Sequence, residues 1–547
     1  MAFEYQKYNI LRFKSIKRME SCSWVQEKSP YFLFFIILFA IHNRTILLMF
    51  RQISLIATIV AALFLFDTAH AQITTWHASE QLEERPLFPV HFAGSDFEDR
   101  RESVLDSIGS ASVAVLQGAP SPMGFLPIRQ SSEFYYLTGI ESPHAYLILN
   151  GFTGESTLYL ASRDERREYN EGKVISVEDS LLVKEWGGFE HVRRLTELPA
   201  DLKSINDHQE ITTLYTHMSP YEHTALTRSM AYRSLADRDQ DPLDNRPGRF
   251  ELFIEELEAL APNLEMKNLD LIVDEMRRIK NDTEIDLITV STRLQGEAIL
   301  EAMRSTEIGV KAYELEAVAK YIYHKHDIQD DAYYPLIHIG PDAFMNHYHN
   351  SVRPAKNGDM ILMDYGAYYN YYSSDMARMW PANGTFNPIQ RELYSFYLIF
   401  YENILYTIDL GLTPQQIIKT ALEKTGTDLE GFTFTEPAHE EAARMFLDSY
   451  RRSANNPLMR MGHGVGMAVH DVGNYTVPLE PGMVFVIEPQ FRVEEEHIYL
   501  RLEDMIVMTE EGAEIISDFV PRDIDSIEQI LAEEGMLQQF NLLFLED

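Results

Sequence analysis

Five residues in the carboxyl-terminal half have side chains of the types that can bind cations. Most of them lie beside strand-like sequence. Burying a charge at the end of a strand is costly unless the charge is paired or bound to a metal. One such carboxylate is usually a satisfied structural residue, but four carboxylates and an imidazole in one region favour a metal site. Oxygen-rich ligation suits cations such as Mn²⁺, and carboxylates could hold two of them about 3.5–4 Å apart, where a bridging water becomes a nucleophile. These residues are Asp364, Asp375, His463, Glu488 and Glu503.

Two further histidines accompany this set: His347 precedes Asp364, and His470 lies between His463 and Glu488. An imidazole beside a metal site could polarise a carbonyl or stabilise a tetrahedral intermediate. A lone histidine is more often an ordinary hydrogen-bonded residue, and we keep that reading for His349. From the residues alone, His347 and His470 could take either role.

The elements that must position these residues can be read from apolar runs and turn signals. Asp364 follows the run Ile361–Met363 and Asp375 follows the tyrosine-rich stretch Tyr368–Tyr372, a spacing that suits the two arms of a hairpin. Glu488 ends a further apolar run, Val484–Ile487. The sequence therefore predicts that strands carry the acidic residues toward one another.

Two domains are expected outside the amino-terminal leader. Residues 84–265 alternate apolar strands with polar helices, which predicts an α/β domain. Residues 269–547 begin with two helical segments and continue with strands, for which the pattern alone allows either an α+β or an α/β class. The expected strands of the first domain are 113–116, 146–149 and 158–160, and the expected helices of the second are 282–305 and 312–326.

Charge and cysteine content exclude several classes of function. The formal net charge is −37, and so acidic a surface repels nucleic acid and anionic lipid, so no nucleic-acid partner is expected. The single cysteine, Cys22, lies in the leader. A mature chain without cysteine has no disulfide framework, cysteine-ligated zinc or thiol nucleophile.

Residues 1–71 are interpreted as a leader that contains a signal peptide. The apolar run Ile53–Phe66 follows Arg51 and precedes Ala69-His70-Ala71, which is the order of a charged region, an apolar region and a cleavage site. Met49 could be the true start, and cleavage is expected after Ala71. The alternative is a membrane anchor, but the run is shorter than the ~20 residues of a spanning helix. We therefore expect export to the periplasm or medium, without stable membrane insertion after the signal is removed.

The motifs around the five residues resemble those of the metallopeptidase family that contains Xaa-Pro aminopeptidase (aminopeptidase P), prolidase and methionine aminopeptidase. They occur in the order of that family. The resemblance implies a pita-bread catalytic domain with a dinuclear metal site. The motifs are Leu362–Ala367, Ser374–Arg378, Gly462–Gly466, Ile487–Pro489 and Arg501–Asp504.

The amino-terminal stretch Ile128–Gly139 resembles the corresponding stretch of aminopeptidase P. Methionine aminopeptidases lack this domain, which counts against them. The resemblance therefore implies a creatinase/aminopeptidase P-like α/β domain in front of an α+β pita-bread domain. It also implies removal of the first residue from peptides with proline second, by attack of a metal-bridging hydroxide. The implied cofactors are two divalent ions, with Mn²⁺ favoured, and the implied assembly is a dimer or tetramer.

The resemblance assigns a role to each residue that matches a family motif. Asp364 and Asp375 would bind metal, and Asp375 and Glu503 would bridge the two ions. His463 and Glu488 would complete the ligand set, and Glu488 or a neighbouring residue would shuttle a proton. The remaining matches are His347 and His470 facing the substrate, Arg501 supporting the site, and Glu133 reaching the active site of a neighbouring subunit.

One position departs from the family pattern. Met459 stands where relatives often carry a histidine that helps to form the proline pocket. A methionine could still pack against a pyrrolidine ring, so the preference for proline is open. Two alternatives also remain: a prolidase that takes only dipeptides, and a catalytically inactive peptide-binding protein. The amino-terminal motif favours the aminopeptidase, and the complete set of five ligands disfavours the inactive protein.

Overall fold

The computed structural model describes residues 86–124, 126–220, 227–328 and 330–539. The predicted leader, with Met49 and the cleavage site after Ala71, lies outside the described residues. Within those ranges, we find no helix that combines the length and the apolar character needed to span a bilayer.

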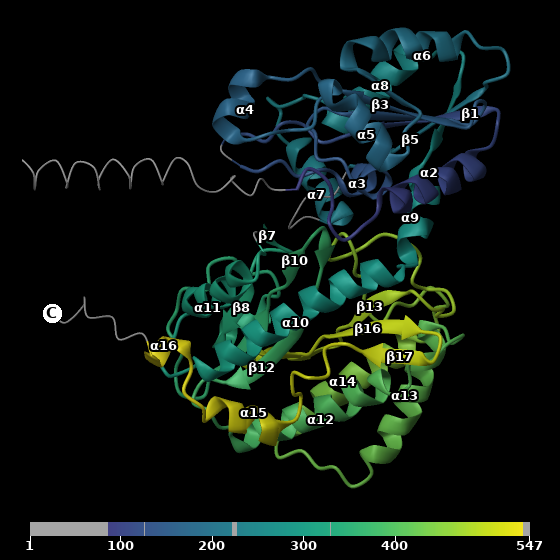
Figure 1. Ribbon diagram of the computed structural model, residues 1–547. Coiled ribbons are helices and arrows are strands. Elements are labelled where there is room, and N and C mark those ends of the chain that lie inside the picture. Colours follow the sequence, from purple (N-terminus) through teal and green to yellow (C-terminus); the bar gives the residue numbers. More distant parts are fainter. Residues whose placement is uncertain (1–85, 125, 221–226, 329, 540–547) are drawn as a thin grey trace, which may run out of the picture. The chain divides into compact units, whose positions relative to one another are not determined.

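The amino-terminal domain is built on a mixed sheet of six strands in the order β4-β3-β2-β1-β5-β6 (Figure 1). β1 pairs antiparallel with β2 and parallel with β5, and β2 pairs antiparallel with β3. The three strands predicted in this domain correspond to β1, β2 and β3 and are confirmed. The strands are β1 Ser112–Gln117, β2 Tyr146–Asn150, β3 Glu155–Leu160, β4 His191–Arg194, β5 Thr213–Thr216 and β6 Glu265–Asn268.

Helices cover both faces of this sheet because its central strands are apolar on both sides. In β1, Val113 and Val115 contribute to one apolar cluster with α6 and α8. Ala114 and Leu116 point to the opposite face and join a second cluster with α2, α3 and α5. The helices are α2 Gly94–Ile108, α3 Ser132–Thr138, α4 Glu165–Glu171, α5 Ser180–Gly187, α6 Leu198–Asn206, α7 Arg228–Arg238, α8 Arg249–Leu260 and α9 Asp270–Arg278, with short 3₁₀ turns η1 Val177–Asp179 and η2 Leu195–Glu197.

The second cluster continues into the following domain. Beyond α9, it includes residues of α10 and buried side chains of β13 and β16, among them Val486 and Met505. The carboxyl-terminal end of β13 leads directly to Glu488. The core of the amino-terminal domain therefore also supports a strand that positions a predicted site residue.

In the part of the carboxyl-terminal domain that the structure describes, the strands form four small sheets, which is the α+β alternative. Their orders are β11-β10-β7, β12-β9-β8, β13-β16-β17 and β14-β15. The strands are β7 Asp330–Asp331, β8 Leu336–Ile339, β9 Met360–Asp364, β10 Ala367–Tyr369, β11 Tyr372–Ser373, β12 Ala377–Pro381, β13 Val484–Ile487, β14 Gln490–Val493, β15 Ile498–Arg501, β16 Asp504–Thr509 and β17 Gly512–Ile515.

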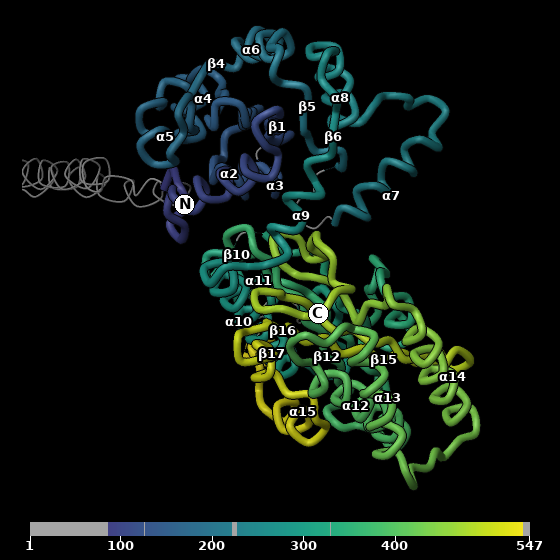
Figure 2. Tube along the Cα trace, turned by 90° about the vertical axis from the view of Figure 1, so that its right-hand side faces the viewer, coloured from purple at the N-terminus to yellow at the C-terminus, as the bar shows by residue number. Residues whose placement is uncertain are grey.

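Long helices pack around these sheets, and α12, α13 and α14 lie side by side (Figure 2). The two helices predicted at the start of this domain are α10 and α11 and are confirmed. The helices are α10 Asp282–Arg304, α11 Ala312–Lys325, α12 Pro388–Leu405, α13 Pro414–Asp428, α14 Pro437–Ser453, α15 Ile524–Leu531 and α16 Met536–Gln539, with 3₁₀ turns η3 Gly340–Phe344 and η4 Glu494–Glu496.

The hairpin predicted to bring Asp364 and Asp375 together is present, with an insertion. β9 and β12 pair antiparallel, and Asp364 lies opposite Ala377, so Asp375 enters β12 beside it. The intervening residues form the smaller hairpin β10–β11, which belongs to another sheet. Its turn places Asn370 and Tyr371 at φ values of 47° and 73°, the left-handed conformation that two-residue hairpin turns require.

Candidate metal centre

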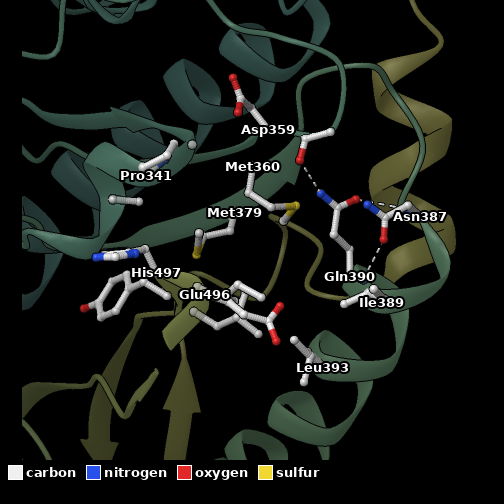
Figure 3. Close-up of a pocket in the computed structure, with 16 residues that line it drawn as sticks. Pro341, Asp359, Met360, Met379, Asn387, Ile389, Gln390, Leu393, Glu496 and His497 are labelled. Carbon is white, nitrogen blue, oxygen red and sulfur yellow. Dashed lines mark hydrogen bonds between the residues drawn. The ribbon is translucent and has the colours of Figure 1, made fainter. Parts of the chain in front are cut away.

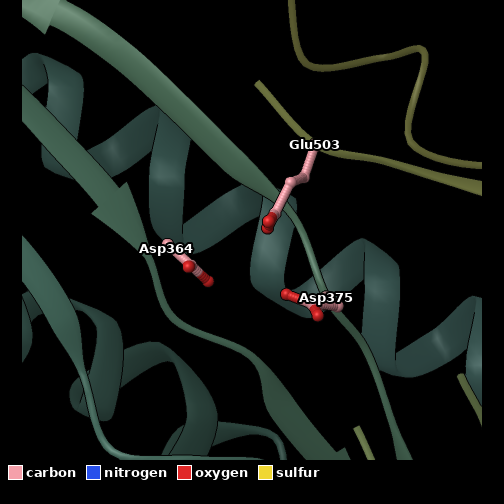
Figure 4. Close-up of side chains that lie close together, drawn as sticks. All are labelled: Asp364, Asp375 and Glu503. Carbon is pink, nitrogen blue, oxygen red and sulfur yellow. The ribbon is translucent and has the colours of Figure 1, made fainter. Parts of the chain in front are cut away.

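Three carboxylates from three separate segments converge at one point. Asp364 ends β9, Asp375 precedes β12, and Glu503 lies between β15 and β16. One oxygen from each lies within 4.8 Å of the others, and Figure 4 shows the three side chains directed toward a common space. All three are buried, with exposed fractions of 3%, 4% and 2%. Buried carboxylates held this close require a cation to balance them.

A tyrosine hydroxyl joins two of these carboxylates. Tyr333 Oη lies 2.7 Å from Asp375 Oδ1 and also contacts Asp364 Oδ1. One hydroxyl hydrogen cannot serve both acceptors fully, so this contact orients the two aspartates without neutralising them. The sequence analysis did not identify Tyr333, because a tyrosine in the run Tyr333-Tyr334-Pro335 carries no local signal of this role.

His463 and Glu488 extend the cluster on one side. His463 Nε2 lies 3.3 Å from Asp375 Oδ2 and 3.7 Å from Glu488 Oε1. Its Nδ1 lies 3.1 Å from the carbonyl oxygen of Gly464, an arrangement that leaves Nε2 free to act as a ligand. Burial opposes protonation of His463, but Asp375 and Glu488 outweigh it and raise the pKa of this imidazole. The structure thus brings all five predicted ligands to one place.

Arg501 places its guanidinium among the acids, as its predicted supporting position requires. It contacts Asp364 Oδ2 through Nη2. Its Nη1 lies 3.7 Å from Glu488 Oε2, and its Nε lies 3.4 Å from Glu503 Oε1. One guanidinium therefore faces three carboxylates, which leaves the cluster with a surplus of negative charge.

The surplus of negative charge disfavours ionisation of Glu503. Burial, together with the carboxylates of Asp375 and Glu488, raises the pKa of Glu503 well above its ordinary value despite Arg501. Glu503 Oε2 is buried and has no hydrogen-bond partner among the residues that the structure describes. An unpaired buried carboxylate oxygen inside an oxygen-rich cluster fits the donor set of hard divalent cations.

His347 and His470 are both exposed at the edge of the cluster. The rings of His463 and His470 stack with their centroids 3.7 Å apart. Partial burial and the positive charge of Arg501 lower the pKa of His347, so its imidazole is neutral at pH 7. Both histidines are therefore accessible to a substrate above the carboxylates.

Glu133 lies apart from the carboxylates. It is buried, with an exposed fraction of 4%, and pairs with Arg228 at 3.2 Å and Arg277 at 3.4 Å. The proposed reach into a neighbouring subunit would have to break both pairs. In this structure, the Glu133 carboxylate belongs to an ion-pair network of its own chain.

Met459 lies at a cavity of about 560 Å³ whose wall also contains Glu488. Residues Ser449, Tyr450 and Ser453 of α14 form another part of the wall. Met459 itself is mostly buried, with an exposed fraction of 6%. The position that departs from the family pattern is therefore in the approach to the predicted ligand Glu488.

A second cavity of about 330 Å³ lies at the opposite end of β9 from Asp364. Met360, at the start of the strand, and Met379 of β12 are directed into it (Figure 3). The sulfur of Met379 accepts a hydrogen bond from the backbone N–H of Arg501 at 3.3 Å. None of the three converging carboxylates lines this cavity, so it is separate from the metal centre.

Family models match both domains. Residues 286–510 match metallopeptidase family M24, and residues 97–215 match the aminopeptidase P amino-terminal domain. The first match contains all five predicted metal ligands. The second match contains Glu133 and most of the six-stranded sheet.

Two similar proteins each match most of this chain. Over 429 residues, the chain is 28% identical to the Xaa-Pro aminopeptidase of Haemophilus influenzae, covering 74% of this chain and 89% of that protein. It is 25% identical to the Xaa-Pro aminopeptidase of Escherichia coli, covering 80% of this chain and 97% of that protein.

Solved structures share the fold. Aminopeptidase P from Escherichia coli superposes with a TM-score of 0.64 at 23% identity, covering 80% of this chain and 98% of that one. Proline aminopeptidase P II from Yersinia pestis gives a TM-score of 0.64 at 24% identity, covering 81% and 100%. With two matched domains in the same order and a buried acidic centre, the chain belongs to the aminopeptidase P group of the M24 metallopeptidases, and is a metal-dependent exopeptidase with the pita-bread fold.

Proposed function

We propose that the chain removes the first residue from peptides whose second residue is proline, with two Mn²⁺ ions as cofactors. The observation that carries the proposal is the convergence of Asp364, Asp375 and Glu503 within 4.8 Å. The aminopeptidase P amino-terminal domain over residues 97–215 supports this activity over that of other members of the family. The oxygen-rich donor set supports Mn²⁺.

The residues that would hold the ions are Asp364, Asp375, His463, Glu488 and Glu503. Bound divalent cations would supply Lewis acidity toward a peptide carbonyl and would lower the pKa of water. Tyr333 would keep the Asp364 and Asp375 carboxylates in one orientation through its hydroxyl. Arg501 would hold the Asp364 carboxylate and limit the negative charge that remains.

Glu488 is the acid best placed to move a proton. Its side chain is 22% exposed, whereas those of Asp364 and Glu503 are 4% and 2% exposed. Its Oε1 lies 3.7 Å from His463 Nε2 and its Oε2 lies 3.7 Å from Arg501 Nη1. We therefore assign to the Glu488 carboxylate the transfer of a proton from the attacking water to the leaving nitrogen.

His347 and His470 would bind the substrate from the exposed side. A neutral imidazole can donate one hydrogen bond to the scissile carbonyl, where negative charge develops in the transition state. His470 stacks on His463 and remains exposed. Replacing either histidine by alanine should lower kcat about a hundredfold to a thousandfold, the range for losing one such donor.

The pocket around Met459 would determine how strongly proline is preferred. Methionine offers an apolar, flexible surface but no hydrogen-bond donor. We expect Met459→His to raise the ratio of kcat/KM for a proline peptide over an alanine peptide about tenfold, equivalent to roughly 1.4 kcal/mol. The ratio is measured in competition assays, and an unchanged ratio would mean that this position does not contact the second residue.

We also propose export of the chain and assembly into dimers or tetramers, as expected from the leader and the family. Cleavage after Ala71 would be checked by amino-terminal sequencing of protein recovered outside the cytoplasm. Sedimentation at several concentrations would give the number of subunits.

The activity is tested with the full chain, Mn²⁺ and three substrates: Xaa-Pro-Yaa, Xaa-Pro and Xaa-Ala-Yaa. Metal-dependent release of the first residue from the proline tripeptide is the expected result. Asp375→Ala should abolish it, whereas Glu514→Gln, which alters an exposed acid on β17, should not. Cleavage of the alanine peptide alone would mean a remodelled pocket, and hydrolysis of the dipeptide alone would overturn the aminopeptidase assignment.

A further inference from the structure

Asp471, the residue after His470, has a buried carboxylate that is paired with two positively charged side chains. Its carboxylate lies 2.5 Å from Arg277 Nη2 and 3.0 Å from Lys280 Nζ. The three side chains are each 1% exposed. Burial opposes ionisation, but Arg277 and Lys280 outweigh it and hold the pKa of Asp471 below its usual value. The Asp471 carboxylate is therefore ionised and held in one position, next in the chain to His470.

The backbone around Asp471 connects this ion-paired carboxylate to the segment that carries His463. The N–H of Asp471 donates to the carbonyl oxygen of Gly464 at 2.8 Å, and Gly464 follows His463. The rings of His463 and His470 stack 3.7 Å apart. A Cβ at Gly466 would come within 2.1 Å of Asp471 Oδ2, so the loop approaches this carboxylate as closely as a glycine allows. The position of the Asp471 side chain thus fixes the loop that carries both histidines.

The other end of the network lies in the amino-terminal domain. Arg277, in α9, also pairs with Glu133 of α3 at 3.4 Å. Glu133 pairs in turn with Arg228 at 3.2 Å, and Arg228 pairs with Asp274 at 2.6 Å. Buried ion pairs are weakly screened and hold strict geometry. A continuous path of charged contacts therefore runs from α3 to the loop of His470.

We propose that Asp471 and Arg277 are positioning residues that hold the His470 imidazole against His463, and that through Glu133 the amino-terminal domain takes part in catalysis. The inference rests on the proposed function, in which His470 contacts the substrate. Asp471 and Arg277 do not touch the substrate themselves. Their effect is on geometry, and small displacements of a catalytic group reduce rates strongly.

The first test uses Asp471→Asn, which preserves shape but removes the charge, in the Mn²⁺-loaded full chain. We expect kcat on Xaa-Pro-Yaa to fall about thirtyfold, with KM changed less than twofold and metal content unchanged. In a His470→Ala background, the same substitution should have no further effect on kcat, because the group that it positions is absent. Arg278→Gln, on the neighbouring position of α9, is the matched control and should behave as the wild type.

A purely structural network predicts a different pattern. Asp471→Asn would then lower activity by the same factor with and without His470, and that additivity would overturn the proposal. Because Asp471→Asn could fail to fold, Glu133→Gln provides a second variant that leaves the Arg277–Asp471 pair in place. It should lower kcat a few-fold in the same His470-dependent way, and a loss that persists in His470→Ala would contradict the proposed path.

A measurement without turnover separates this inference from the proposed function. The ring ¹³C signal of His470, assigned with His470→Ala, should shift or broaden in Asp471→Asn while the signal of His497 stays in place. An unchanged His470 signal would overturn the positioning role. Failure of the wild type to cleave any of the three peptides would instead overturn the proposed function, and the ¹³C result would still decide the geometry.

Discussion

Glu503 and Asp504 are neighbours in the sequence and are equally buried, but their surroundings are opposite. Asp504 receives Arg378 Nη2 at 2.7 Å, Arg522 Nη1 at 3.0 Å and the Tyr401 hydroxyl at 2.7 Å. Glu503 faces other carboxylates, and one of its oxygens has no hydrogen-bond partner within the described part of the chain. One acid is satisfied by the protein, and the other is left for a cation from solution.

The two environments shift the pKa values of Glu503 and Asp504 in opposite directions. Burial alone would raise the pKa of Asp504, but Arg378 and Arg522 outweigh it and hold the pKa below its usual value. Burial and neighbouring carboxylates raise the pKa of Glu503 well above its usual value. Burial of an acid therefore does not by itself indicate a metal ligand. The nature of its neighbours distinguishes a structural acid from a functional one.

The largest expected effect is the loss of activity when Glu503 is replaced. Glu503→Gln should lower kcat/KM at least about a thousandfold, roughly 4 kcal/mol of transition-state stabilisation, because a ligand is lost. The melting temperature in EDTA should not fall, since the substitution removes a charge that neighbouring carboxylates repel. A clear drop in that melting temperature would mean that Glu503, like Asp504, stabilises the fold, and would contradict the contrast between the two acids.

The next effect is on stability at the satisfied acid. Arg378→Ala should lower the free energy of unfolding by about 3 kcal/mol, because it leaves a buried carboxylate short of a partner. Urea denaturation with and without Mn²⁺ measures this change. Arg391→Ala, which breaks ion pairs of a half-exposed arginine, is the control and should cost less than about 1 kcal/mol.

Asp270 extends the comparison to the amino-terminal domain and adds a pH dependence. Burial raises its pKa, but the contact with His217 outweighs this and lowers the pKa of Asp270 from 3.8 to about 2. A depressed folded-state pKa gives stability that is present above about pH 4 and lost as the pH falls toward 2. Asp270→Asn should remove about 2 kcal/mol of that acid-dependent stability, measured by urea unfolding between pH 5 and pH 2.5. If the unfolding free energy depends on pH equally in the variant and the wild type, the ion pair with His217 does not stabilise the ionised form of Asp270.

The smallest effect concerns one donor among several at Asp504. The Ser517 hydroxyl donates to Asp504 Oδ1 at 2.5 Å, while both arginines and Tyr401 remain as partners. Ser517→Ala should therefore cost only about 1 kcal/mol of unfolding free energy and leave kcat unchanged. A loss of activity without a loss of stability would mean that the Asp504 environment also acts on the metal centre.

The elements of the fold could be predicted where their sequence pattern is local. The apolar runs at 113–116 and 484–487 are strands, and the helical spacing at 282–305 gives α10. The predicted ligands meet because each follows such a strand or loop. The contacts of Tyr333 with Asp364 and of Arg378 with Asp504 could not be predicted, since they join segments whose pairing depends on tertiary packing. Glu133 shows the same limit, because its burial between two arginines leaves no trace in the local pattern.

The apolar cluster that joins the two domains has a consequence for how such chains can be divided. Val484, Val486, Met505 and Val507 are packed in the same cluster as Phe97, Val104 and Leu147. A chain cut between the domains would expose the apolar faces of β13 and β16 to water, an arrangement that promotes aggregation. The two matched regions are thus recognisable separately in sequence, but their shared apolar cluster implies that they fold together.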